Sequence, residues 1–206
     1  MPSKKNHSAA AARILDVAEQ LVQTRGFNGF SYADIAKQLD VTKASLHYHF
    51  PSKEVLGRAL VERYEEAFDR ELEAIRQQTS KGLERLRRYV NLYDAVMRKD
   101  RVCLCGMLAA EYITLPVPMQ NELRRFFKSN ERWLAAVLEE GRRLGDLSFR
   151  GSARDRAGVL LGALEGTMLV ARSYSDGRVF RSAAKRLLAD LSKNGAAKST
   201  PSQPRR

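Results

Sequence analysis

Two histidines and two cysteines are the residues in this chain whose types most directly suggest chemistry. One residue separates His47 from His49, and one residue separates Cys103 from Cys105. On a helix, residues two apart in number point about 200° away from one another, so neither pair can easily share a metal ion. Structural zinc needs four ligands at recognisable spacing, and no further cysteine or histidine cluster accompanies either pair. The sequence therefore predicts no metal site and no cofactor.

The segment CLCGML, which begins at Cys103, leaves two interpretations open. A disulfide between Cys103 and Cys105 would be strained, because sulfurs at this spacing on a helix diverge. If the nearby Arg101 stabilises a thiolate, one cysteine is a candidate sensor of oxidants or electrophiles. Small buried packing residues are the alternative.

The sequence carries no catalytic motif that we recognise. It lacks a G-x-S-x-G nucleophile elbow, a phosphate-binding loop, a dinucleotide-binding fingerprint and a zinc-binding helix motif. We therefore expect that the protein is not an enzyme.

The overall charge indicates the kind of partner. The 206 residues include 36 Lys and Arg against 24 Asp and Glu, a net charge of +12 that favours a polyanion such as nucleic acid. The N-terminus lacks the apolar core of a secretory signal, and no stretch approaches the roughly 18 apolar residues of a membrane helix. We expect a cytoplasmic protein without a membrane partner.

Helical spacing of apolar residues runs through the chain and predicts an all-α fold of about nine helices. A first helix ends near Gly26, and Ser31 with Asp34 forms a capping box for a short second helix. Thr42 caps a third helix, which reaches about Tyr48. Pro116 and Pro118 predict a break in the segment TLPVPMQ. Residues 1–8 and 193–206 are expected to be disordered.

The second and third helices form the geometry by which a helix-turn-helix places its second helix in the major groove of DNA. A helix from Thr42 to Tyr48 is roughly 10 Å long, short enough for a groove about 12 Å wide. Hydrogen-bonding side chains dominate this helix, while Leu46 and Phe50 are apolar and suited to anchoring it.

The stretch from Ile14 to Leu56 resembles the DNA-binding domain of the TetR/AcrR family of bacterial transcription regulators. The resemblance rests on Gly26-Phe27, Ile35-Ala36, Val41-Thr42-Lys43 and above all on LHYHFPSKE. Asp40 stands where the family often has glycine, and aspartate tolerates a left-handed conformation better than most residues. Ala44-Ser45 and His47 also depart from the common pattern, which affects the operator sequence rather than the fold.

The resemblance implies a DNA-binding domain over 9–55 and a ligand-binding and dimerisation domain over 56–192. It implies a homodimer, usually a repressor, that a small-molecule effector releases from double-stranded DNA. The residues that it places on the duplex are Ser31, Tyr32, Thr42, Lys43, Ser45, His47, Tyr48 and Lys53, of which Ser31, Tyr32 and Lys53 would meet phosphates.

Glycines in the second domain indicate how two copies would associate. Gly158, Gly162 and Gly166 recur every four residues, so another helix backbone can approach closely. We expect a homodimer through the last two helices, with burial inside one subunit as the alternative. The candidates for contact with an unidentified effector, or for sensing, are Cys103, Cys105, Met107, Tyr112, Trp133, Glu165 and Met168.

The predicted function is a ligand-responsive transcription regulator. A repressor released from a palindromic operator by a small molecule or a reactive species fits best. A non-specific architectural DNA-binding protein is the alternative, and the basic C-terminal segment and the high pI of about 10.0 argue for it.

Overall fold

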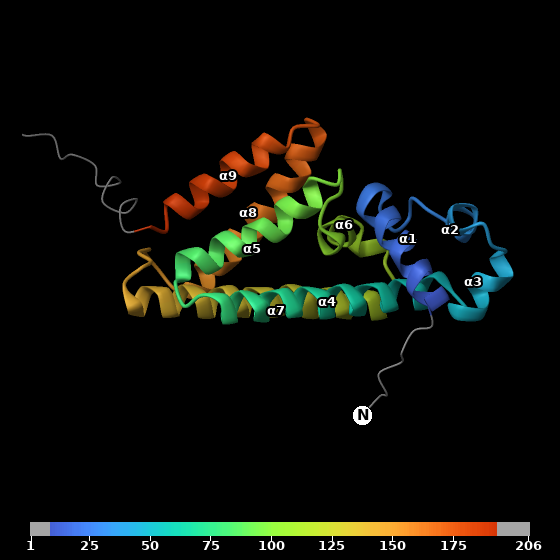
Figure 1. Cartoon of the computed structure of the whole chain (residues 1–206), viewed down its shortest axis with the longest axis horizontal. Coiled ribbons are helices and arrows are strands. Elements are labelled where there is room, and N and C mark those ends of the chain that lie inside the picture. The colour runs from blue at the N-terminus through green and yellow to red at the C-terminus, as the bar shows by residue number, and fades with distance from the viewer. Residues whose placement is uncertain (1–8, 193–206) are drawn as a thin grey trace, which may run out of the picture. The chain divides into compact units, whose positions relative to one another are not determined.

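The computed structural model describes residues 9–192, which are predominantly helical (Figure 1). Within this range the chain forms nine α-helices and one short 3-10 helix, and no strand, which confirms the predicted all-α class. The segments 1–8 and 193–206, predicted to be disordered, lie outside the described residues.

The helices follow one another through short connections, as Figure 1 shows. In chain order they are α1 (Ala9–Arg25), α2 (Tyr32–Leu39), α3 (Lys43–His49), α4 (Lys53–Gln78), α5 (Gly82–Met97), α6 (Leu104–Ala110), the 3-10 helix η1 (Tyr112–Thr114), α7 (Val117–Leu144), α8 (Ala153–Ser173) and α9 (Gly177–Ala189).

The local signals for helix ends operate as the sequence predicts. Gly26 ends α1 in the left-handed region with φ 84°, and Asp40 does the same after α2 with φ 54°. The backbone N–H and hydroxyl of Ser31 both donate to the Asp34 carboxylate, each at 2.7 Å. Ser152 caps α8 by accepting the Asp155 N–H at 3.0 Å.

The predicted break at TLPVPMQ is shorter than expected. α7 begins at Val117 and includes Pro118 in its first turn. Proline is tolerated there because the first backbone N–H groups of a helix have no intrahelical acceptor. Pro118 therefore lies inside the first turn of α7, and the helix begins before it.

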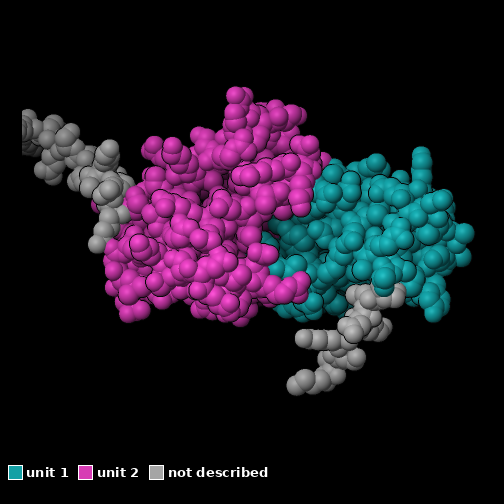
Figure 2. All heavy atoms as spheres, viewed as in Figure 1, with its two compact units in different colours: residues 1–68, 101–126 teal, residues 69–100, 127–206 magenta. Residues whose placement is uncertain are grey.

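The chain packs as two compact units, each assembled from two stretches of sequence (Figure 2). Of the described residues, unit 1 comprises 9–68 and 101–126, and unit 2 comprises 69–100 and 127–192. The helices α4 and α7 each contribute residues to both units. The predicted domains over 9–55 and 56–192 were defined by function, whereas these units are defined by packing. The domain boundaries therefore stay a prediction.

Unit 1 holds the first three helices against α4 and α6. The Val102 N–H donates to the Gln23 carbonyl, and the Glu111 carboxylate accepts the Phe27 N–H at 2.5 Å. Arg63 of α4 pairs with Asp16 at 2.6 Å and with Glu19 at 2.7 Å. The large apolar side chains that are almost fully buried here include Leu15, Leu21, Ile35, Leu46, Leu56 and Leu60.

Unit 2 is built around α8, which packs against α9 and α5. Arg85 of α5 pairs with Glu140 of α7, and the Asp146 carboxylate accepts the Gly82 N–H. The side chains of Leu160, Leu164 and Phe180 form part of its core. Within residues 9–192, no helix is both long enough and apolar enough to cross a membrane.

Candidate nucleic-acid interface

Helix α3 is fixed at both of its ends. At its start, the Thr42 hydroxyl accepts the Ser45 N–H at 3.2 Å, which is the predicted cap. At its end, the Phe50 N–H donates to the Leu46 carbonyl at 2.8 Å. Leu46 and Phe50 are buried, with exposed fractions of 1% and 2%. One side of this short helix therefore anchors it to the rest of unit 1.

The other side of α3 presents polar side chains to solvent. Tyr48 is 84% exposed, and its ring meets the His49 ring edge-on with 5.1 Å between centroids. The other predicted contacts of α3 are also exposed, namely Thr42, Lys43, Ser45 and His47. The face offers one cationic group and several hydrogen-bonding groups at the surface, as direct reading of base edges and phosphates requires.

Tyr32 lies beneath this face. It is only 8% exposed, and its hydroxyl donates to the Phe50 carbonyl at 2.7 Å. Its ring lies 4.7 Å from the His47 ring, and His47 Nδ1 is 3.2 Å from the Pro51 carbonyl oxygen. Tyr32 therefore connects α2 to the end of α3 and positions His47. A phosphate contact through its hydroxyl would compete with this buried hydrogen bond.

Tyr32→Phe is expected to lower the free energy of unfolding by about 1 kcal/mol at pH 8, since it removes one buried hydrogen bond. Burial raises the pKa of Tyr32 to about 12. Above pH 10 the unfolded chain therefore loses this proton while the folded chain keeps it, so stability falls as the pH rises from 10 to 12. Urea titrations at pH 8 and pH 11 test both points, because Tyr32→Phe should lose less stability over this interval than the parent. Equal losses would contradict the assignment.

Two further predicted contacts already have partners within unit 1. The Lys53 ammonium donates to the Phe30 carbonyl and lies 4.4 Å from the centroid of the Phe30 ring. Desolvation lowers the pKa of Lys53. The Ser31 hydroxyl donates to Asp34, and this interaction lowers the pKa of the Asp34 carboxyl. To contact phosphate, Lys53 and Ser31 would each have to share or exchange a hydrogen bond.

The remaining candidates are divided between the two units. Cys103, Cys105, Met107 and Tyr112 belong to unit 1, whereas Trp133, Glu165 and Met168 belong to unit 2. Both cysteines are buried and form no disulfide, and Tyr64 donates to Cys103 Sγ at 3.7 Å. Within residues 9–192, no cluster of three or more His, Cys, Asp or Glu could hold a metal ion.

Several polar groups lie around Trp133 in the interior of unit 2. Its ring stacks on Tyr89 with 5.5 Å between centroids, and the Tyr89 hydroxyl donates to Asn130 Oδ1 at 3.0 Å. The Tyr93 hydroxyl lies 3.0 Å from that of Tyr89. Among the described residues, the buried Trp133 indole N–H has no hydrogen-bond acceptor. Tyr89, Tyr93 and Asn130 were not among the residues predicted from the sequence, although two tyrosines four residues apart share one face of a helix.

Comparison with known families covers most of the chain. Residues 14–60 match the family described as "Bacterial regulatory proteins, tetR family", and residues 82–187 match the family described as "Tetracyclin repressor-like, C-terminal domain". The chain belongs to the TetR family. It is therefore a ligand-responsive, DNA-binding transcriptional regulator.

Individual relatives of this TetR-family regulator include transcription regulators and a nucleoid occlusion factor. A TetR-family regulator from Agrobacterium tumefaciens has a TM-score of 0.87 and 34% identity, covering 91% of this chain and 100% of its own. The transcriptional repressor NemR of Escherichia coli is 29% identical over 164 residues, which is 77% of this chain and 82% of NemR. The crystal structure of its reduced form has a TM-score of 0.73 at 26% identity, covering 86% and 94% of the two chains. The nucleoid occlusion factor SlmA of Vibrio campbellii is 28% identical, over 74% of this chain and 78% of its own.

An uncovered apolar face lies on unit 2 of this regulator. Gly158, Gly162 and Gly166 are exposed, and a Cβ atom built on any of them would meet nothing within 4 Å. Val159 and Val170 on the same helix are 58% and 45% exposed. Apolar side chains on this side of α8 thus remain in solvent in the single chain, whereas Leu160, Leu161, Leu164 and Met168 are buried.

Proposed function

We propose that this TetR-family regulator is a repressor that binds a palindromic operator as a homodimer and is released by a small molecule. The observation that carries the proposal is α3, a short helix with both ends fixed and its polar face exposed. Repression is the activity in the name of NemR, which supports it. No comparable observation supports an enzymatic function. A regulator of bacterial DNA would act in the cytoplasm.

Five residues of the exposed face would make the contacts that specify sequence. Lys43 would pair with a phosphate or a guanine edge, and Tyr48 would stack on or hydrogen-bond to bases or sugar. Thr42, Ser45 and His47 would complete the set. We assign Tyr32 the role of positioning His47, while Ser31 and Lys53 would meet phosphates only by sharing their present hydrogen bonds.

Dimerisation would cover the exposed face of α8 together with a flank of α9. The glycines of α8 allow a partner helix to approach closely, and Val159 and Val170 supply apolar area. On α9, the half-buried Val179, Ala183 and Leu187 recur every four residues and form one side of the helix. Two recognition helices related by the dimer axis would require half-sites about one duplex turn apart, roughly 34 Å.

Fluorescence anisotropy with the DNA upstream of the protein's own gene would test the proposal directly. A scrambled duplex of equal length serves as the competitor, and the titration is repeated across a salt series. Preference for the native duplex of at least roughly 10³-fold, with affinity falling steeply in salt, supports a specific regulator. Equal affinity for both duplexes would favour the alternative of a non-specific architectural protein, for which the SlmA relatives provide a weak hint.

The effector site of the proposed repressor would include Trp133. An unmet buried N–H costs about 1–3 kcal/mol, so an acceptor atom on a ligand would relieve this cost. Glu165 is half-buried on α8 and Met168 is buried there, and both stay candidates for the same unit.

Trp133→Phe keeps an aromatic ring at this position and removes the N–H. We expect the effector concentration that releases half of the operator to rise about tenfold, the cost of one hydrogen bond. Operator affinity without effector should not change. Effectors are first found by screening compounds against the parent complex in the anisotropy assay. Ser182→Ala, at an exposed position of α9, is the control. An unchanged half-release concentration would remove Trp133 from the effector site.

A reactive species is the second candidate effector, and Cys103 is the residue that supports it. Cys103 is the N-cap residue of α6, and its sulfur accepts the Tyr64 hydroxyl hydrogen bond. A helix N-terminus and a donated hydrogen bond both favour the reactive thiolate, although burial opposes it. Cys105 lies within α6 and is fully buried.

Under this reading, N-ethylmaleimide should release the operator from the parent and from Cys105→Ser, but not from Cys103→Ser. The comparison is internally matched because both variants replace a buried sulfur with oxygen. Mass spectrometry of the treated parent identifies the alkylated residue. Release of DNA from Cys103→Ser at the parental rate, or alkylation of Cys105 alone, would leave both cysteines as packing residues.

A further inference from the structure

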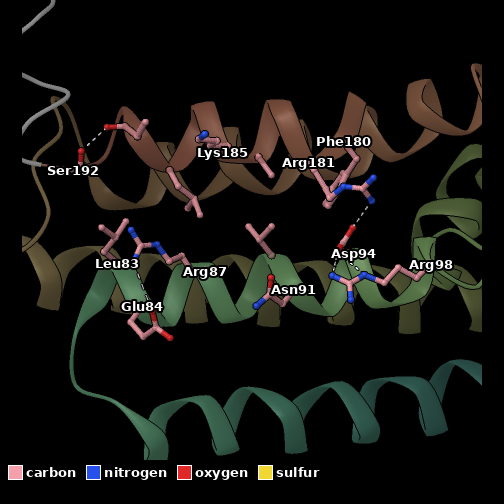
Figure 3. A pocket seen from close by; sticks show the side chains of 14 residues that line it. Leu83, Glu84, Arg87, Asn91, Asp94, Arg98, Phe180, Arg181, Lys185 and Ser192 are labelled. Atoms are coloured by element: carbon pink, nitrogen blue, oxygen red, sulfur yellow. Dashed lines mark hydrogen bonds and ion pairs between the residues drawn. The ribbon is translucent and has the colours of Figure 1, made fainter. Parts of the chain in front are cut away.

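A groove of about 630 Å³ lies between α5 and α9 within unit 2 (Figure 3). Its floor is apolar, since Val90, Phe180, Ala184 and Leu188 line it and are buried. Its charged lining residues are four basic and two acidic, namely Arg87, Arg98, Arg181, Lys185, Glu84 and Asp94. The groove therefore combines an apolar surface with an excess of positive charge.

Both acidic residues of the groove are already neutralised by arginines. Asp94 is 5% exposed, and its two oxygens accept hydrogen bonds from Arg98 at 2.6 Å and Arg181 at 3.3 Å. The Glu84 carboxylate lies 3.0 Å from Arg88 Nε and 3.8 Å from Arg87. Neither carboxylate is therefore positioned to repel an incoming anion strongly.

Lys185 is the cation of the groove that is left for a ligand. Among the described residues it has no ion-pair or hydrogen-bond partner, and it lines the groove from α9, as Figure 3 shows. Arg181 lies one helical turn away. A guanidinium has five N–H donors, and Arg181 uses one of them on Asp94.

We propose that this groove binds a small amphipathic carboxylate. The carboxylate lies between Lys185 and Arg87, with the Asn91 amide as a further donor, and the apolar chain covers Val90, Ala184 and Leu188. The volume falls in the range of small-molecule sites, about 300–1,000 Å³. The chain's own segment 193–206 is a poor occupant, because it contains four basic residues and no acidic one.

The groove is compatible with the proposed homodimer. Val179 on the dimer side of α9 and Arg181 on the groove side are two residues apart, so their side chains point about 200° away from one another. The inference needs neither the dimer nor the operator, because ligand binding is measured on the protein alone. Failure of the groove proposal would thus leave the proposed repressor function untouched.

Isothermal titration calorimetry with octanoate tests the proposal. We expect saturable binding of one octanoate per chain and no heat of binding with octyltrimethylammonium, which carries the opposite charge. Lys185→Ala should weaken octanoate binding about tenfold, the cost of one charge-assisted hydrogen bond. Arg186→Ala is the matched control, because Arg186 is an exposed cation on the same helix that does not line the groove.

Three outcomes would overturn the proposal. Equal weakening by Arg186→Ala would show that only the general surface charge attracts octanoate. Full affinity in Lys185→Ala together with lost affinity in Trp133→Phe would place octanoate in the effector site instead. Co-sedimentation with phosphatidylglycerol vesicles that Lys185→Ala abolishes, without binding of free octanoate, would assign the groove to a lipid surface.

Discussion

Lys43→Ala is expected to weaken binding to the operator about 100-fold at physiological salt. Lys43 is exposed at the start of α3, and Tyr48 is exposed near its end. The loss of one charge-assisted contact to DNA costs about 1.4 kcal/mol, or tenfold, and a symmetric dimer loses it at both half-sites. Because Lys43 is exposed, the fold should keep its parental stability.

Anisotropy titrations across a salt series measure this effect and its origin. If Lys43 neutralises a phosphate in each half-site, the slope of log affinity against log salt should decrease by about two. If Lys43 instead reads a base edge, discrimination between operator variants should weaken at one symmetric pair of positions. Lys128→Ala, which removes an exposed lysine from α7, is the control. Parental affinity in Lys43→Ala would exclude α3 as the recognition helix.

Gly162→Glu is expected to convert the dimer into monomers at micromolar concentration and to reduce operator affinity more than about 10³-fold. The glycine lies at the middle of the exposed α8 stripe, where an added Cβ atom would meet nothing within 4 Å. In a dimer, two carboxylates would be buried near the symmetry axis, at a cost of several kcal/mol each. A monomer retains one recognition helix and holds only one half-site.

Sedimentation velocity and operator anisotropy should change together in this variant. Ala136→Glu on α7 is the matched control, because it also places a glutamate at an exposed helical position. Circular dichroism melts confirm that Gly162→Glu still folds, which is expected because the site is open in the single chain. A dimeric Gly162→Glu protein would move the interface away from α8, and a parent that sediments as a monomer would end the dimer proposal.

The local features of this fold could be predicted from the sequence because the interactions that create them are short. Asp40 adopts the left-handed conformation, and Thr42 and Ser152 cap their helices through residues only three positions away. The family likewise followed from a contiguous motif that ends in LHYHFPSKE. The break predicted over TLPVPMQ is too long, because the effect of a proline depends on whether it lies in the first turn of a helix or inside it.

The burial of side chains and their hydrogen-bond partners could not be predicted from the sequence. Tyr32 and Lys53 looked like surface residues for phosphate, yet they hydrogen-bond to Phe50 and Phe30, which are 18 and 23 residues away. The division of the ligand candidates between two units follows from stretches of chain that are distant in sequence. No periodicity of a single helix reveals which remote helix it packs against.

The sequence by itself determined the helices, their caps, the TetR-family motif and the polar face of α3, because each depends on neighbours within a turn or two. The tertiary structure decided that Tyr32 supports this face from below, that the Trp133 N–H lacks an acceptor and that Asp94 meets Arg181, 87 residues away. Desolvation and pairing of polar groups depend on which surfaces meet when the chain closes, and only the packed fold specifies those meetings.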